Sequence, residues 1–410
     1  MVSRKKYILT IMVVVLVTAF LTVTLGNVFL VEMGQKVVLS EETYTEMKDM
    51  YDKYAKQESV MQIAKNDFLY DADEDVMLEG ALEGTLKALG DPYTQYLSKK
   101  DFAALMQDTE GTYEGIGVYI TASDDNKIMI VSPIEDTPAE KAGLKTGDKI
   151  IKINGTEYSS DQIDAAVGVM KGMPGTSVTL TIQRENTEGK QEVSEIIINR
   201  EKIRIKTIKP AMLEDDIGYI KITTFDMQTA DDFKVAYNDL KTQGMKSLVI
   251  DLRYNPGGII DATVDISKMF MGEGVVTYTK TKAGEIEYFK SDKNMEDLPM
   301  VLLINEGSAS ASEIMAGALK DTHRATLIGT KSFGKGIVQR VQRFGNDGEG
   351  IKMTVSEYFT PNGINIHGIG IEPDIELKLS EDAEGYGSEF YETDNQLQKA
   401  VEVLKEKANQ

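Results

Sequence analysis

Short apolar runs alternate with segments of helical periodicity between residues 201 and 379, and this alternation restricts the fold more than any other feature. The run Ser247–Leu252 is almost continuously apolar, as expected for a strand that is covered on both faces. Comparable runs occur at Ile217–Ile222 and Met300–Asn305, and a helical pattern occupies Ala230–Thr242. Strands that alternate with helices predict an α/β core with a partly parallel sheet.

Two loops rich in small residues follow these expected strands. One continues from Leu252 to Gly257 and Gly258, and the other leads from Ile304 to Ser310. Ligands of open α/β sheets bind beyond the carboxyl ends of the strands. We therefore expect both loops to border one cleft.

Ser310 and Lys335 are the candidate catalytic pair. Ser310 lies in a tight loop before an alanine-rich helical pattern, and Lys335 stands between Gly334 and Gly336 at the start of another strand. A lysine can act as the base for a serine nucleophile when burial lowers its pKa enough to leave it neutral. The pattern indicates an enzyme that uses this pair.

The residues alone leave alternatives open. Ser308 and Ser312 flank Ser310 as equal candidates for the nucleophile, and Lys331 is a rival base. Asp251 and Glu313 would make a carboxylate pair, although Asp251 at the end of a strand is more typical of a turn cap. His367 would suggest a serine–histidine arrangement.

Composition excludes several other classes of site. The chain has no cysteine, which removes thiol nucleophiles, thiolate–zinc sites and disulfides, and its two histidines form no zinc-protease motif. A net charge of −21 argues against a nucleic-acid partner, because phosphate binding needs a basic surface. We expect no metal and no organic cofactor.

The N-terminus predicts a membrane anchor. Arg4, Lys5 and Lys6 precede an uncharged run, Tyr7–Val31, which is long enough to cross a bilayer as a helix. A good cleavage site is missing, so we favour an uncleaved signal anchor over a cleaved signal peptide. The positive-inside rule then places residues 1–6 in the cytoplasm, 7–31 in the membrane and the remainder outside the cell membrane as a single-pass protein.

A helical segment is expected over residues 32–107. Tyr44, Met47, Tyr51 and Tyr54 recur at spacings of three and four, which predicts an apolar stripe on one helix. A second helical pattern ends at Gly90, directly before Asp91 and Pro92. Such stripes pack within the chain or against a second copy, so a homodimer through these N-terminal helices is a candidate assembly.

Residues 108–199 resemble a PDZ domain. A glycine-rich turn at Gly115, Ile116 and Gly117 enters an alternating strand at Val118, and Gly143–Asp148 reads Gly-Leu-Lys-Thr-Gly-Asp. The resemblance implies that N–H groups of the turn hold a C-terminal carboxylate and that the strand accepts an extended peptide.

The α/β region resembles the S41 family of carboxyl-terminal processing serine peptidases. Four stretches carry this resemblance in order: Asp251–Gly258, Ser308–Glu313, Gly329–Gln339 and Pro361–Asp374. The resemblance implies that Ser310 is the nucleophile, Lys335 the general base and Gln339 the group that orients the lysine. It also implies an oxyanion hole made by N–H groups of Gly257, Gly258 and Ala311, and a structural role for His367.

The expected organisation is an N-terminal transmembrane helix, a helical segment, a β-rich PDZ domain (108–199), an α/β peptidase core (200–379) and an acidic, then helical, tail (380–410). The expected function is a membrane-anchored extracytoplasmic endopeptidase that captures exposed C-terminal tails of proteins and cuts peptide bonds. Two alternatives are a non-catalytic PDZ scaffold and a crotonase-like acyl-group enzyme.

Overall fold

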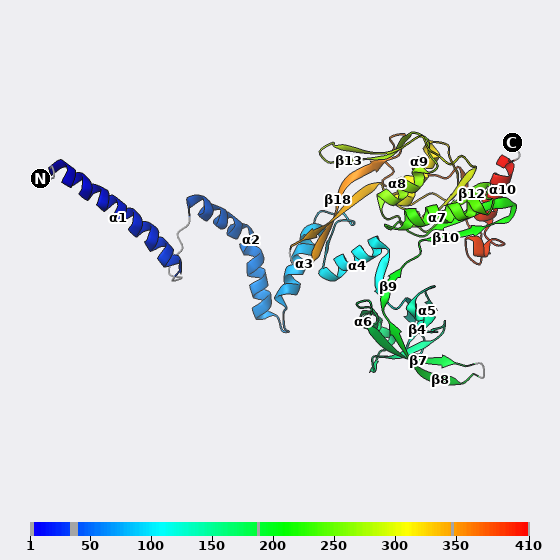
Figure 1. The fold of residues 1–410 in the computed structure, drawn as a ribbon, viewed down its shortest axis with the longest axis horizontal. Coiled ribbons are helices and arrows are strands. Elements are labelled where there is room, and N and C mark those ends of the chain that lie inside the picture. The colour runs from blue at the N-terminus through cyan, green and yellow to red at the C-terminus, as the bar shows by residue number, and fades with distance from the viewer. Residues whose placement is uncertain (1–3, 33–39, 187–188, 346–347, 409–410) are drawn as a thin grey trace. The chain divides into compact units, whose positions relative to one another are not determined.

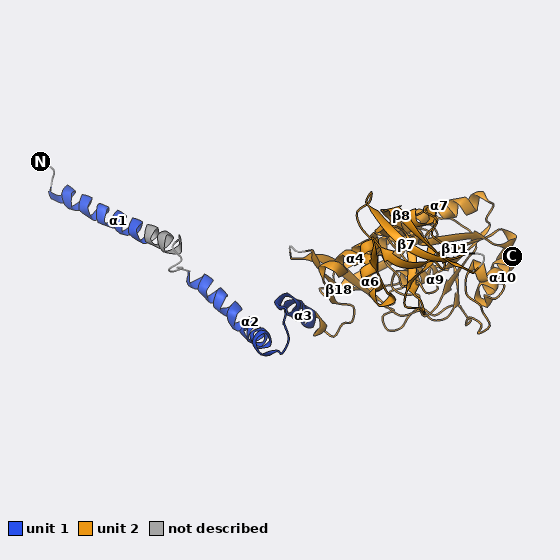
Figure 2. Ribbon diagram, turned by 90° about the horizontal axis from the view of Figure 1, so that it is seen from below, with its two compact units in different colours: residues 1–85 blue, residues 86–410 orange. Residues whose placement is uncertain are grey.

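The structure, a computed structural model, describes residues 4–32, 40–186, 189–345 and 348–408. The chain divides into two compact units, residues 1–85 and 86–410 (Figure 2). In the described residues the first unit is helical, and the strands lie in the second. Each unit is described by itself below.

The first unit is built from α1 (Arg4–Glu32), α2 (Glu41–Asp67) and most of α3 (Glu74–Lys87). The Arg4–Val23 part of α1 is long and apolar enough to span a membrane. Ser40 begins α2 as an N-cap, because its hydroxyl accepts a hydrogen bond from the Thr43 N–H at 3.1 Å. No side chain of α2 or α3 is buried, so their apolar stripes lie open within the described residues.

The central sheet of the second unit has the strand order β10-β11-β12-β15-β16-β19. These strands are Ile208–Met212, Ile217–Ile222, Ser247–Asp251, Met300–Ile304, Thr326–Gly329 and Ile375–Glu376. Neighbours from β11 to β19 pair in parallel, and β10 is antiparallel at the edge. The mixed α/β architecture predicted from the sequence is therefore confirmed.

Helices cover both faces of this sheet (Figure 1). On one face, α7 (Thr229–Thr242), α8 (Ile260–Lys268) and α9 (Ala311–Asp321) pack with Leu248 and Ile250 of β12. On the other, α10 (Asn395–Ala408) packs its Leu397 and Val401 against Val249. Successive side chains of a strand point to opposite faces, which explains why β12 is apolar throughout. The tail predicted to be helical thus packs on the core.

A second sheet borders the first and carries the lysine segment. Its strands are β1 (Gln95–Leu97), β13 (Gly274–Thr281), β14 (Ile286–Ser291), β17 (Ile337–Phe344) and β18 (Glu349–Phe359). The long strand β18 pairs with β17, β1 and β13 along its length. Helix α4 (Lys99–Glu110) lies beside it, with Phe102 against Gly350, where a Cβ atom would come within 2.0 Å of the ring.

The PDZ region forms a sheet with the order β3-β4-β5-β7-β8, and β6 pairs with β5. Its elements are β3 (Val118–Ala122), β4 (Ile128–Pro133), α5 (Pro138–Lys141), β5 (Lys149–Ile153), β6 (Thr156–Glu157), α6 (Ile163–Met170), β7 (Ser177–Glu185) and β8 (Gln191–Asn199). A two-stranded ribbon, β2 (Thr112–Gly115) with β9 (Glu201–Arg204), joins it to the core. The β-rich architecture predicted for this region is confirmed.

Candidate active site

Ser310 occupies a strained turn between β15 and α9. Its φ of 53° and ψ of −113° lie where residues other than glycine are seldom found. The neighbouring serines hold the turn: the Ser308 hydroxyl donates to Leu252 O at 2.8 Å, and the Ser312 hydroxyl donates to Asn255 O at 3.0 Å. Both are completely buried, whereas Ser310 is half-buried. Of the three serines, Ser310 is the one placed to meet a substrate.

The loop after β12 lies directly against this turn. A Cβ atom at Gly257 would come within 2.6 Å of Ala309 O and 2.9 Å of the Ser310 Cβ. Because Gly257 also has a φ of 101°, only glycine fits this close approach. The two loops expected to border one cleft do meet.

Three backbone N–H groups, those of Gly257, Gly258 and Ala311, are the candidate oxyanion donors. The Gly257 N–H is already engaged, since it donates to Asn255 Oδ1 at 2.8 Å. Within the described part of the chain, the N–H groups of Gly258 and Ala311 have no intramolecular acceptor. Ala311 opens α9, where the helix dipole adds positive potential. These two N–H groups are thus free to donate to a developing oxyanion, with Gly257 providing the space.

Glu313 joins the serine turn to the lysine loop. This completely buried carboxylate accepts hydrogen bonds on Oε2 from the N–H groups of Ser310 (2.9 Å) and Lys335 (2.8 Å). On Oε1 it accepts from Ser332 Oγ (2.6 Å) and the Gly334 N–H (2.7 Å). Glu313 does not pair with Asp251. The sequence therefore marked Glu313 as a candidate site residue but did not predict that it connects the serine turn to the lysine loop.

Lys335 is half-buried, and its Nζ lies over the ring of Tyr93, 4.5 Å from the centroid. Burial lowers the pKa of Lys335 and the charge of Lys352 lowers it further, while Asp91 and Glu313 oppose the shift. The rival base Lys331 is exposed and pairs with Glu372 at 2.8 Å. Sequence reasoning gave no role to Tyr93, because nothing local links a turn tyrosine to a lysine more than two hundred residues away.

Gln339 lies on β17, and its Nε2 is 3.5 Å from Thr354 Oγ1 on the paired strand β18. Among the described residues no hydrogen bond joins Lys335 to either Ser310 or Gln339. The Lys335 side chain instead lies over Tyr93, and Ser310 and Lys335 are connected through their backbone N–H groups, which share Glu313 Oε2.

The remaining candidates have structural surroundings. Asp251 Oδ1 accepts the Arg253 N–H at 3.0 Å, the turn cap that its position indicates. The backbone of His367 packs on the lysine loop, where a Cβ atom at Gly336 would lie 2.5 Å from its nitrogen, and its side chain is exposed. No cluster of three or more acidic or histidine side chains able to hold a metal ion occurs in the described residues.

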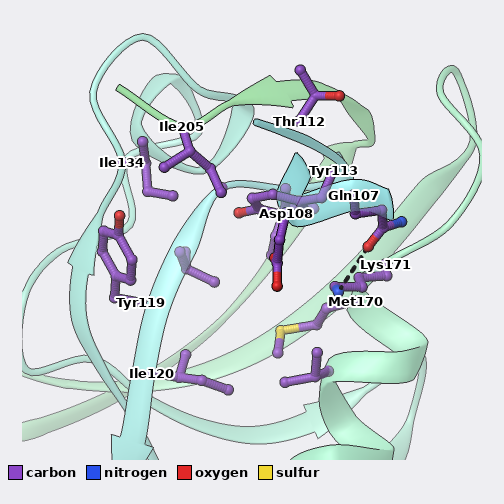
Figure 3. A pocket seen from close by; sticks show the side chains of 15 residues that line it. Gln107, Asp108, Thr112, Tyr113, Tyr119, Ile120, Ile134, Met170, Lys171 and Ile205 are labelled. Atoms are coloured by element: carbon purple, nitrogen blue, oxygen red, sulfur yellow. Dashed lines mark hydrogen bonds between the residues drawn. The ribbon is translucent and has the colours of Figure 1, made fainter. Parts of the chain in front are cut away.

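The PDZ domain contains a groove of about 250 Å³ between β3 and α6 (Figure 3). All four predicted peptide-binding residues line it: Gly115, Ile116, Gly117 and Val118. Apolar side chains of Ile120, Val167 and Met170 form its wall. Burial raises the pKa of Tyr113 to about 12, and the N–H groups of Val118 and Gly117 act on its hydroxyl in the opposite direction. The groove thus combines an apolar wall with backbone donors.

Residues from α4 border the same groove. Gln107 and Asp108 lie on its rim, and Lys171 at the end of α6 donates to Gln107 Oε1 at 3.4 Å (Figure 3). The Lys171 Nζ also lies 5.6 Å from the centroid of the Tyr113 ring. The end of α4 and the PDZ helix are therefore in direct contact at the groove.

Comparison with known proteins identifies three regions. The profile of peptidase family S41 matches residues 216–377, and a PDZ domain profile matches residues 129–184. A third profile, the N-terminal domain of the activating protease CtpB, matches residues 18–101. The matches follow the order in which the motifs occur.

Curated relatives match over most of the chain. A carboxy-terminal-processing protease from Bartonella bacilliformis is 37% identical over 367 residues, which are 87% of this chain and 82% of the relative. The carboxy-terminal processing protease CtpA of Bacillus subtilis is 34% identical, covering 89% and 76%. A solved structure of a putative S41 protease from Bacteroides fragilis matches the fold with a TM-score of 0.50 at 18% identity, covering 79% of this chain and 90% of that one.

Proposed function

Because this chain belongs to peptidase family S41 and is a carboxy-terminal processing serine protease with a PDZ domain, we propose that Ser310 and Lys335 form its catalytic dyad. The observation that supports the dyad is the shared carboxylate oxygen: Glu313 Oε2 accepts the N–H of both residues. Family membership favours peptide hydrolysis over the scaffold and the acyl-group enzyme, which have no comparable support.

The dyad performs hydrolysis in two stages. Neutral Lys335 takes the proton of Ser310 Oγ as this oxygen attacks the carbonyl carbon of the scissile bond. The N–H groups of Gly258 and Ala311 donate to the oxyanion, and the lysine ammonium then gives its proton to the leaving amine. Water attacks the resulting ester with Lys335 again as base, and Ser310 is regenerated. Gln339 orients the lysine through a hydrogen bond during these steps.

Lys335 must leave Tyr93 to serve as base. A ring face stabilises an ammonium group more than a neutral amine, so the contact with Tyr93 favours the inactive protonation state. The segment that carries Tyr93 is held by Asp91, which accepts the Tyr93 N–H at 3.0 Å and the Thr94 hydroxyl at 2.6 Å. Catalysis therefore requires the lysine to rotate toward Ser310 and Gln339.

The PDZ groove captures the C-terminal tail of the substrate. Strand β3 is an edge strand of its sheet, so an extended peptide can pair with it while its carboxylate meets the N–H groups of the Gly115–Gly117 turn. Deletion of residues 108–199 should abolish the preference for substrates with a free apolar C-terminus. Unchanged cleavage rates and tail dependence in that deletion would refute tail capture.

Helix α1 anchors the protein in the membrane, with the peptidase outside. Its Arg4–Val23 segment has a mean hydropathy of 2.3, and three basic residues lie at its start. Protease added to intact cells should digest the peptidase region while sparing the N-terminus. A protein that is released by alkaline carbonate washing would contradict the anchor.

A homodimer forms through the open stripes of α2 and α3. Tyr51 is 69% exposed on α2 and Val76 is 63% exposed on α3, and these stripes are large for helices that stay in water. Sedimentation of residues 40–410 should give a dimer, and the double substitution Tyr51→Glu with Met47→Glu should give a monomer. A monomeric parent would refute this assembly.

The dyad is tested with the full chain in detergent and an unfolded protein that ends in apolar residues. The parent should cleave it, whereas Ser310→Ala and Lys335→Ala should not, with each variant checked for folding by circular dichroism. Lys331→Ala is the matched control, because it removes an exposed lysine of the same loop. Full activity in either dyad variant would refute the proposal.

A further inference from the structure

A buried ionic cluster lies at the carboxyl end of β12. It stands at the start of residues 253–258, which we call the oxyanion loop because they end at the Gly258 N–H. The side chains of Arg253, Asp251 and Asp394 are at most 1% exposed. The guanidinium uses all of its nitrogens: Nε donates to Asp251, Nη1 to Asp394 and Gln396, and Nη2 to both carboxylates. Burial by itself would lower the pKa of Arg253, but the two carboxylates raise it. The cluster is complete only with residues from the C-terminal segment.

Asp394 comes from a segment outside the S41 match, and it is separated from Arg253 by 141 positions. Its Oδ1 accepts from Arg253 Nη1 (3.0 Å) and the Leu397 N–H (3.0 Å). Its Oδ2 accepts from Arg253 Nη2 (2.7 Å) and the Gly387 N–H (2.7 Å). Four donors therefore converge on one carboxylate, which ties the start of α10 to the loop after β12.

Tyr386 of the same segment contacts the next residue of that loop. Its ring lies 5.0 Å from the ring of Tyr254, and the Lys221 ammonium lies 3.7 Å from its centroid. Tyr254 has a φ of 57°, an uncommon conformation for a residue with a bulky side chain. Such a conformation persists only where the surroundings enforce it, and Tyr386 covers one side of this residue.

The loop that follows Arg253 leads to the Ser310 turn and to the Gly258 N–H. The Tyr254 N–H donates to Asn305 Oδ1 at 2.8 Å, and Asn255 O accepts the Ala309 N–H at 3.0 Å. Two residues further, Gly257 touches the Ser310 turn, and Gly258 presents its free N–H. Residues 254–258 thus connect Arg253 to the free N–H of Gly258.

We propose that the C-terminal segment Tyr386–Gln396 is a positioning element of the active site, in which Asp394 acts through Arg253 to set the oxyanion loop. This inference rests on the proposed roles of Ser310 and of the Gly258 N–H. Asp394 touches no reacting atom, so it is a positioning residue. Its loss leaves Arg253 buried with one carboxylate in place of two and frees the loop to move away from Ser310.

The test is Asp394→Asn in the full chain, assayed with the unfolded protein substrate. An amide can accept at only one of the two oxygen positions, so its NH₂ group would face two donors. We expect kcat to fall about tenfold to a hundredfold, because a small displacement of catalytic groups is that costly, while KM stays unchanged. The matched control is Glu402→Gln, an exposed carboxylate of α10 whose ion-pair partner among the described residues is Lys399.

Thermal melting separates positioning from unfolding, since a partly unfolded enzyme loses active molecules but the remainder keep the parental turnover. If Asp394→Asn does not fold, Tyr386→Leu replaces it, and a lowered kcat at parental KM is again expected. Parental kcat per folded molecule in the variant that folds would overturn the inference. Activity that survives Ser310→Ala would instead overturn the dyad, so the two failures are distinguishable.

Discussion

Replacing Glu313 by glutamine tests whether one carboxylate holds the two halves of the active site together. The parent carboxylate accepts four hydrogen bonds, two on each oxygen. The glutamine oxygen can keep one pair of donors, and its NH₂ group must then face the other pair. Either the Ser310 and Lys335 N–H groups or the Ser332 and Gly334 donors lose their acceptor.

The expected cost follows from the two lost bonds. Hydrogen bonds to a buried charged group contribute about 1.5–3 kcal/mol each, so Glu313→Gln should destabilise the fold by about 3–6 kcal/mol. That is a large part of a typical unfolding free energy of about 5–15 kcal/mol. In either orientation of the glutamine, the loop that carries Lys335 loses at least one hydrogen bond to residue 313, so kcat should also fall in the molecules that remain folded.

Urea unfolding and cleavage kinetics measure the two effects. Asp321→Asn is the control, because this partly exposed carboxylate on the same helix accepts from the Asn362 N–H and an amide oxygen can keep that bond. We expect the control to match the parent in both assays. A Glu313→Gln protein with the parental urea midpoint and turnover would refute the reasoning.

Three further predictions concern the lysine and the oxyanion loop. The cleavage rate should rise with pH through an inflection below 10.5, because neutral Lys335 is the base and burial lowers its pKa. Lys352→Met should move this inflection to higher pH, because it removes a positive charge that lowers the pKa of Lys335. Tyr93→Leu removes a cation–π contact of about 0.5–2 kcal/mol and should move the inflection about 0.4–1.5 pH units lower; no movement would contradict the contact. Gly257→Ala should abolish cleavage, whereas Gly143→Ala, with a similar positive φ in open space, should only lower stability by about 1–2 kcal/mol.

The fold was predictable where the pattern of the sequence is local. The continuous apolar run of Ser247–Leu252 predicted a strand covered on both faces, and β12 has α7–α9 on one face and α10 on the other. The glycine before Asp91 predicted that a helix ends at Gly90, whereas α3 ends three residues earlier, at Lys87; Gly90, with a φ of 72°, lies in the turn that follows. The membrane anchor and the domain boundaries stay predictions.

The site was predictable only in part, because its contacts join distant segments. The order of the motifs predicts Ser310 and Lys335 as the catalytic pair, but the sequence suggests only Asp251 as a partner for Glu313, the carboxylate that connects them. Tyr93 and Asp394 carried no signal, since neither lies in a motif and their partners are 242 and 141 positions away. Pairing across such separations depends on the tertiary fold.

Trapping the covalent intermediate tests the central claim most directly. A slowly deacylating activated ester of an apolar peptide would be mixed with the full chain, quenched in acid, digested and mapped by mass spectrometry. The account predicts an acyl group on Ser310, absent in Ser310→Ala and formed far more slowly in Lys335→Ala. An acyl group on another residue, or equal labelling in the lysine variant, would contradict the serine–lysine dyad.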